Sequence, residues 1–112
     1  MFGIGKDTEL DRESVFEQLK IDEGVVNDLD TAISECVALY GDTFNDWPGV
    51  VQEVLVNMMF NMGRTRLGKF NNFRKALEAQ DWKQAGIEGR DSRWYEQVTS
   101  RAERLMERLE NV

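Results

Sequence analysis

The sequence of 112 residues contains no histidine, one cysteine and one proline. A single cysteine excludes an internal disulfide, and the common Cys/His zinc sites cannot form without histidine. The same two shortages exclude nucleophilic catalysis by Ser-His or Cys-His pairs. We therefore expect no metal centre and no cofactor.

Long apolar runs are also missing. Nowhere do about 18 apolar residues follow one another, as a membrane-spanning helix requires. Charged side chains are scattered through the first twenty residues, so these residues contain no apolar core of a signal peptide. The sequence predicts synthesis in the cytoplasm, with no membrane segment.

Basic residues are scarce in the first half of the chain. Residues 1–56 carry 3 Lys/Arg against 13 Asp/Glu, a net charge of −10, whereas residues 57–112 carry 11 against 8, a net charge of +3. Binding to duplex nucleic acid needs a basic face that neutralises phosphates. The total of −7 therefore argues against a nucleic-acid partner.

Strand-like alternation is absent, and helical spacing takes its place. After a polar lead-in over residues 1–11, we expect a helix over residues 12–23. A second helix should end at Gly41. Its apolar stripe consists of Val26, Leu29, Ile33 and Val37.

Residues 48–62 are apolar on nearly every side, which is typical of a helix in the middle of a bundle. Asp46 is a plausible N-cap for this helix, Pro48 suits its first turn, and Gly63 should follow its end. The sequence therefore predicts an all-α fold, a single domain over residues 1–112 wrapped around this central helix.

The last third of the chain predicts several short helices. Ser92 has the position of an N-cap, and Ser100 with Glu103 has the spacing of a capping box before the final helix. The apolar faces of these helices are formed by Phe70, Phe73 and Leu77; by Trp82, Ala85 and Ile87; and by Ala102, Leu105, Met106 and Leu109.

Three motifs in the second half of the chain are specific in type and spacing. They are "NMMFNMG" at residues 57–63, "SRWY" at residues 92–95 and "SRAER" at residues 100–104. Together they resemble the helical lobe of the T-even bacteriophage lysozymes, the endolysins of glycoside hydrolase family 24. The match runs without a gap over residues 57–101, which implies a lysozyme-like helical bundle.

The stretch "FEQLKIDEG", residues 16–24, resembles the first helix of that family. The resemblance implies that Glu23 is the general acid and that Arg101 contacts and orients it. Burial would raise the pKa of such an acid, and a neighbouring arginine would lower it. We then expect the Glu23 carboxylate within about 4 Å of the Arg101 guanidinium, the reach of an ion pair.

The sequence departs from the family after Glu23. The positions of the family's water-positioning Asp and Thr fall on Ala32 and Ala38, so the β-lobe that carries them is absent or vestigial. In an alternative alignment, residues 9–33 match the segment that follows the β-lobe. "GIGK" at residues 3–6 is then a remnant of the lobe, and Glu23 has no catalytic meaning.

Other candidate residues lie on both sides of the central helix. Asp28 and Asp30 could replace the missing carboxylate, although acids in the first turn of a helix also simply favour its dipole. Arg64, Arg66 and Lys69 follow Gly63, where the resemblance places the border of the substrate cleft. They are the candidates for contact with an anionic glycan or peptide.

The resemblance implies a protein of phage or prophage origin that acts on bacterial peptidoglycan, in the manner of a muramidase that hydrolyses the β-1,4 link between N-acetylmuramic acid and N-acetylglucosamine. With an incomplete catalytic set, we expect weak or no hydrolysis by the isolated chain, and delivery to the periplasm for any action there. A non-catalytic scaffold, a binding module or a truncated remnant is the alternative. Whether a partner chain completes the cleft stays open.

Overall fold

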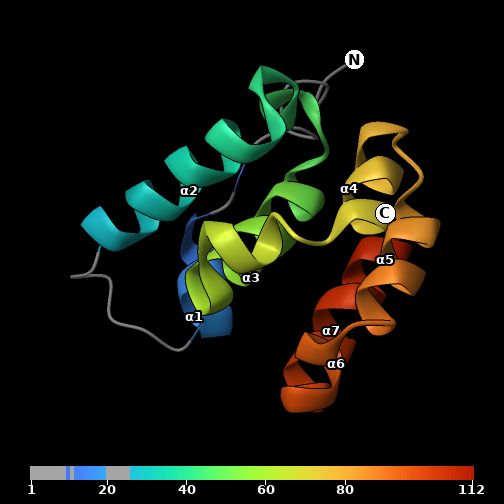
Figure 1. The fold of residues 1–112 in the computed structure, drawn as a ribbon. Coiled ribbons are helices and arrows are strands. Elements are labelled where there is room, and N and C mark those ends of the chain that lie inside the picture. Colours follow the sequence, from blue (N-terminus) through green and yellow to red (C-terminus); the bar gives the residue numbers. More distant parts are fainter. Residues whose placement is uncertain (1–9, 11, 20–25) are drawn as a thin grey trace.

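The computed structural model describes residues 10, 12–19 and 26–112, and these residues form seven α-helices and one 3-10 helix (Figure 1). None of the described residues forms a strand. The all-α prediction is therefore confirmed. In chain order the elements are α1 (Arg12–Leu19), α2 (Val26–Tyr40), η3 (Asp42–Asp46), α3 (Gly49–Leu67), α4 (Asn71–Glu78), α5 (Trp82–Arg90), α6 (Arg93–Gln97) and α7 (Thr99–Glu110).

Helix α3 is the centre of the molecule, as its apolar composition predicts. Every residue from Val51 to Met59 is buried, and Leu55 and Met58 are fully shielded from solvent. Helices α1, α2 and α7 all pack against α3 (Figure 1). Because neighbours cover α3 on several sides, the helix needs no polar face of its own.

The 3-10 helix η3 turns the chain from α2 into α3. Its Phe44 is fully buried, and an aromatic cluster of Tyr40, Phe44, Trp47 and Trp82 surrounds the turn. The rings of Trp47 and Trp82 meet edge to face, with centroids 5.8 Å apart. This contact joins the end of η3, just before α3, to the first residue of α5.

Helices α4 to α7 form the second half of the molecule, on the right of Figure 1. Helices α5 and α7 approach closely because α5 carries Gly86 and Gly89 on the shared face. A Cβ atom on Gly89 would overlap the sulfur of Met106, which is fully buried. Glycine at this position lets the two helices come together.

The predicted caps have mixed outcomes. The Ser92 side chain caps α6 by accepting a hydrogen bond from the backbone N–H of Tyr95 at 3.2 Å, as predicted. The prediction of Asp46 as a cap is wrong, because Asp46 ends η3 and Pro48 stands at the N-cap of α3. The capping box of Ser100 and Glu103 is also wrong, since α7 already begins at Thr99.

Gly63 breaks α3, as the sequence predicts. Its φ of 82° and ψ of 164° lie outside the helical region. Beyond this break the chain forms a second, short helical segment that ends at Leu67. Four residues of the final apolar stripe, Ala102, Leu105, Met106 and Leu109, are buried as expected. Ile87 is different: it is 54% exposed, because the glycines and Ala85 of α5 face the core instead.

The central position of α3 has a direct consequence for stability. We expect Leu55→Ala and Met58→Ala each to lower the free energy of unfolding by about 2 to 5 kcal/mol, because each leaves a cavity in a fully buried site. Chemical denaturation followed by circular dichroism measures this loss. Val112→Ala, at the 48% exposed C-terminal residue, is the control. Losses below about 0.5 kcal/mol at both core positions, the range of surface changes, would contradict a central α3.

Candidate functional site

Arg101 lies near the start of α7 and reaches across to α3. Its Nη1 donates a hydrogen bond to Oδ1 of Asn61 at 2.7 Å. Nδ2 of Asn61 in turn donates to both the backbone oxygen and Oδ1 of Asn57, at 2.8 and 2.7 Å. Glu23 lies outside the described residues, so the expected pairing of Glu23 with Arg101 stays a prediction.

Asp30 and Arg64 border the same open depression, of about 600 Å³, between α2 and the turn after Gly63. Thr31, Ser34, Glu35 and Ala38 complete its lining. The structure thus brings together one candidate acid and one candidate substrate-binding arginine that are far apart in the sequence. The side chain of Asp28 lies outside the described part of the chain.

Arg66 and Lys69 lie elsewhere. Nη2 of Arg66 donates to Oε1 of Gln97 at 3.3 Å, on the exposed surface beside α6. Lys69 lines a second depression of about 340 Å³, together with residues of α4 and of the α5–α6 connection. Arg64, Arg66 and Lys69 therefore point to three different neighbours, because the chain changes direction after Gly63.

The second depression is lined by aromatic and charged side chains. Phe70 and Phe73 contribute the rings, which meet edge to face with centroids 6.0 Å apart. Charges of both signs line the same hollow, from Lys69 and Arg93 and from Glu88 and Asp91. Phe73 is only 1% exposed, so the partly buried Phe70 is the ring that these polar groups accompany. An aromatic ring beside polar groups suits a sugar or a short peptide, which presents both apolar and hydrogen-bonding surfaces.

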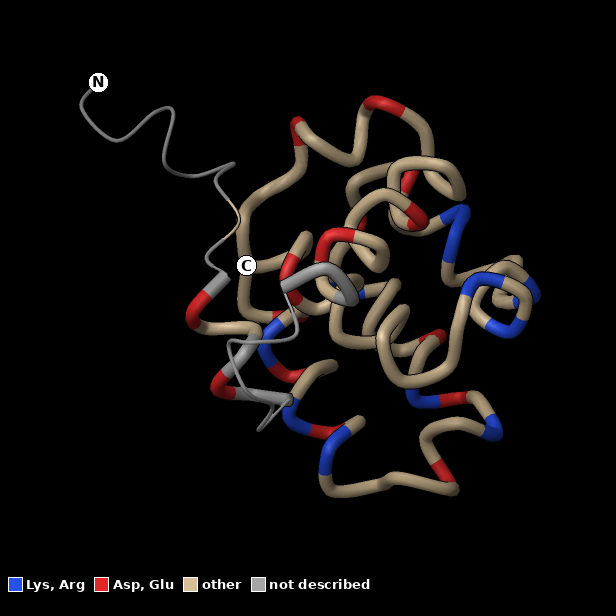
Figure 2. The backbone as a smooth tube through the Cα atoms, turned by 90° about the vertical axis from the view of Figure 1, so that its left-hand side faces the viewer, with Lys and Arg blue, Asp and Glu red and all other residues tan. Residues whose placement is uncertain are grey.

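Charge is distributed unevenly over the two halves of the molecule. Residues 26–63, which include α2, η3 and most of α3, contain Asp and Glu but no Lys or Arg, whereas α7 carries both signs along its length (Figure 2). Arg64 and Arg101 are thus basic groups at the edge of an acidic half. In the described ranges, no three metal-binding side chains come together as a metal site.

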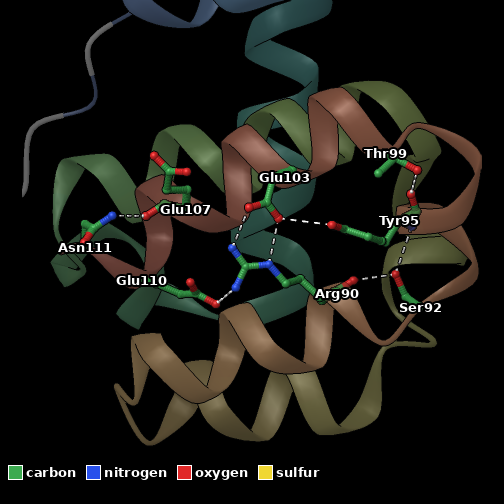
Figure 3. A network of polar contacts seen from close by, with 9 residues as sticks. Arg90, Ser92, Tyr95, Thr99, Glu103, Glu107, Glu110 and Asn111 are labelled. Carbon is green, nitrogen blue, oxygen red and sulfur yellow. Dashed lines mark hydrogen bonds and ion pairs between the residues drawn. The ribbon is translucent and has the colours of Figure 1, made fainter.

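A polar network holds α7, and with it Arg101, against α5 (Figure 3). The guanidinium of Arg90 donates to both carboxylate oxygens of Glu103, from Nε at 2.8 Å and from Nη2 at 3.1 Å. Its Nη1 pairs with Glu110, about two helical turns further along the same face of α7. The Tyr95 hydroxyl donates to Glu103 at 3.1 Å and ties α6 to the same group.

These contacts displace pKa values in predictable directions. The hydrogen bonds from Arg90 and Tyr95 lower the pKa of Glu103, and the Arg90 bonds have the larger effect. The same bond to Glu103 raises the pKa of Tyr95. On the other side of the bundle, burial raises the pKa of the Cys36 thiol, so this cysteine is a packing residue rather than a nucleophile.

Two polar residues next to Arg101 were not among the sequence candidates. Asn61 contacts Arg101 directly, and Asn57, which is 1% exposed, anchors Asn61. Their spacing of i and i+4 in a helix was a usable signal, because such side chains lie on one face. A buried Asn in an otherwise apolar helix is also expected to have a hydrogen-bond partner, because buried polar groups are rarely left unsatisfied.

Comparison with known proteins supports a T4-type lysozyme-like protein. The chain is 46% identical over 54 residues to the pre-baseplate central spike protein Gp5 of Enterobacteria phage T4. This match covers 48% of this chain and 9% of that protein. It is 36% identical over 52 residues to the probable T4-type lysozyme 2 of Dictyostelium discoideum, covering 46% of this chain and 31% of that protein. The resemblance to T4-type lysozymes is therefore confirmed over about half of the chain.

The likeness is limited in extent. The chain spans less than a third of the length of either relative. No family model matches the sequence, and no solved structure matches it. Among the described helices, none is long and apolar enough to cross a membrane.

The network around Arg90 predicts an acid-sensitive contribution to stability. The pKa of Glu103 is lowered in the folded state. Its contribution to the free energy of unfolding is therefore fully present at pH values above the ordinary glutamate pKa of about 4.3, and it is lost as the pH falls through the folded-state pKa. We expect Glu103→Gln to flatten the fall in unfolding free energy below about pH 5. Urea denaturation at several pH values measures this difference.

Glu107→Gln is the matched control, because Glu107 is an exposed carboxylate in the same helix. It should leave the acid dependence close to that of the wild type. An equal flattening in both variants would mean that the lowered pKa of Glu103 has no part in the acid response.

Proposed function

We propose that this chain is a lysozyme-related protein of phage or prophage origin that engages bacterial cell-wall peptidoglycan as one lysozyme-like helical domain. The observation that carries the proposal is its similarity to a phage T4 spike protein and to a T4-type lysozyme. Exposed basic groups beside open depressions, Arg64 in one and Lys69 in the other, suit an extended anionic polymer. The protein would be made in the cytoplasm and would need delivery to the periplasm.

The finer proposal concerns hydrolysis of the β-1,4 link between N-acetylmuramic acid and N-acetylglucosamine. Glu23 is the proposed general acid and Arg101 its orienting partner. Hydrolysis of a glycoside ordinarily needs a second carboxylate, about 5 Å away for retention or about 6.5 to 9.5 Å away for inversion. Asp30, beside Arg64 in the depression, and Asp28 are the weaker candidates for that role.

A lone general acid leaves most of the catalysis unaccounted for. General acid catalysis contributes about 100-fold to 10,000-fold. Enzymes reach accelerations of about a millionfold or more. We therefore expect the isolated chain to be a weak or inactive muramidase that still binds cell wall.

A non-catalytic binding module or scaffold is the second candidate function. The observation that favours it is the chemistry of the two positions where the resemblance expects a water-positioning Asp and Thr. Ala32 is buried at 4% exposure, and Ala38 lines the depression beside Arg64. Neither side chain has a polar atom that could hold a water molecule.

Release of soluble fragments from purified peptidoglycan, together with pelleting of the protein with insoluble cell wall, separates these functions. We expect wild type and Glu23→Gln to pellet equally, and fragment release by the wild type to be small. Arg64→Ala combined with Lys69→Ala should weaken pelleting by about tenfold, the effect of losing about 1.4 kcal/mol of binding free energy. Glu17→Gln, on the exposed face of α1, is the control for Glu23→Gln.

Two outcomes would change the assignment. Turnover like that of a complete phage lysozyme, abolished by Glu23→Gln but not by Glu17→Gln, would mean that the catalytic set is complete. Asp28→Asn and Asp30→Asn would then identify the second carboxylate. If the protein shows neither turnover nor pelleting, the cell-wall function is refuted, and a scaffold or a truncated remnant is the remaining interpretation.

A further inference from the structure

Helix α2 has an outer face that the rest of the described molecule leaves open. The helix lies at the edge of the bundle and packs inward on α3, with Cys36 fully buried (Figure 1). On the opposite side, Thr31, Ser34 and Ala38 are exposed. All three line the open depression of about 600 Å³ that Arg64 also borders. The depression is thus a hollow along the outside of one helix.

Small side chains form the exposed stripe in this hollow. Positions 31, 34 and 38 follow one another at spacings of three and four, so they lie on one face of α2. The axes of two helices approach to about 8 Å where the side chains at the contact are small, and to about 10 Å where they are large. The stripe therefore suits a second helix that lies along it.

The charges that line the hollow differ in sign between its two ends. Asp30 stands in the N-terminal half of α2, and Glu35 adds a second carboxylate. Arg64 lies beside the C-terminal half, because Gly68 in the same turn lies next to Leu39. A surface that is acidic at one end and basic at the other is complementary to a copy of itself rotated by 180°.

We propose that a second copy of this chain occupies the depression, with the two α2 helices antiparallel about a two-fold axis at Ser34. Residue 38 of one chain then lies opposite residue 30 of the other, since both are four residues from the axis. Arg64, beside Ala38, meets Asp30 of the partner subunit. The symmetry forms the same pair again on the other side of the axis.

Electrostatics and size limit the strength of this dimer. Each chain carries a net charge of −7. At an ionic strength of about 0.15 M, charges more than about 8 Å apart are largely screened, so the opposite charges in contact at the axis dominate. A contact made by one helix and one turn belongs to the small interfaces, below about 1,200 Å². We therefore expect a weak dimer that forms at high protein concentration.

The first test is a cross-link at the proposed axis. In Ser34→Cys two equivalent thiols face each other, so copper phenanthroline should oxidise them to a disulfide dimer, seen on a non-reducing gel. Ser100→Cys, the same change at an exposed serine of α7, is the matched control. The Ser34→Cys dimer should form at least about tenfold faster, because the contact raises the effective concentration of the two thiols. The wild type should stay monomeric, since Cys36 is buried.

Sedimentation velocity gives an independent measurement on the reduced protein. The mean mass of the wild type should rise toward twice that of one chain as the concentration increases. Arg64→Glu should abolish this rise, because it brings carboxylates together on both sides of the axis. Asp30→Arg in the same chain should restore the rise, because the exchange restores both pairs. Lys83→Glu, at an exposed lysine of α5, makes the same charge change elsewhere and should dimerise like the wild type.

Two results would overturn the dimer: a mean mass of one chain at every concentration, or equal cross-linking rates at the two serines. Either would leave the outer face of α2 to a different partner. Circular dichroism verifies the fold of each variant, and if the double exchange does not fold, the cross-link decides. A bound glycan would compete for Arg64, so these tests contain no cell wall, and their failure leaves the cell-wall function untouched.

Discussion

The burial of α3 on nearly every side is the constraint on which the rest of the structure depends. A helix in this position can carry polar groups only where neighbours satisfy them. Its buried polar residues meet this condition in three ways: Gln52 donates to the backbone of Trp47 at the turn from η3, Glu53 accepts from Arg108 at 2.9 Å, and Asn57 holds Asn61. Each buried polar residue of α3 therefore holds a neighbouring group in place: the backbone at Trp47, the side chain of Arg108 or the side chain of Asn61.

Two hydrogen bonds between α3 and α7 set the register of α7. Residues 53 and 61 of α3 reach residues 108 and 101 of α7, so the two helices run in opposite directions with a defined offset. Hydrophobic contact alone is not directional and would tolerate sliding. On the far side of α7, the Arg90 pairs hold the helix against α5. Arg101 consequently stands on a helix that is fixed from two directions.

Local sequence patterns predicted the elements better than their ends. The stripe in α2 and the all-apolar composition of α3 depend on side chains within one helix, and both helices are present. Asp46 was wrong as a cap because it is the last residue of η3, and Ser100 was wrong because α7 already begins at Thr99. The candidate site was harder to predict. Arg64 and Lys69 look like one basic cluster in the sequence, but they border different depressions since the break at Gly63 redirects the chain. The contact of Arg101 with Asn61 joins residues that no local pattern connects.

The single cysteine gives the molecule a built-in reporter. Cys36 is fully buried on the inner face of α2, where that helix lies on α3, and burial raises the pKa of its thiol. A thiol reagent can modify it only when α2 separates from the core, so the rate of modification measures how often this local opening occurs. The outer face of the same helix, at Ser34 and Ala38, borders the depression with Arg64. A ligand that bridges Arg64 and α2 would keep the helix packed against the core. Its binding would then slow the modification of Cys36, although the ligand does not contact the thiol.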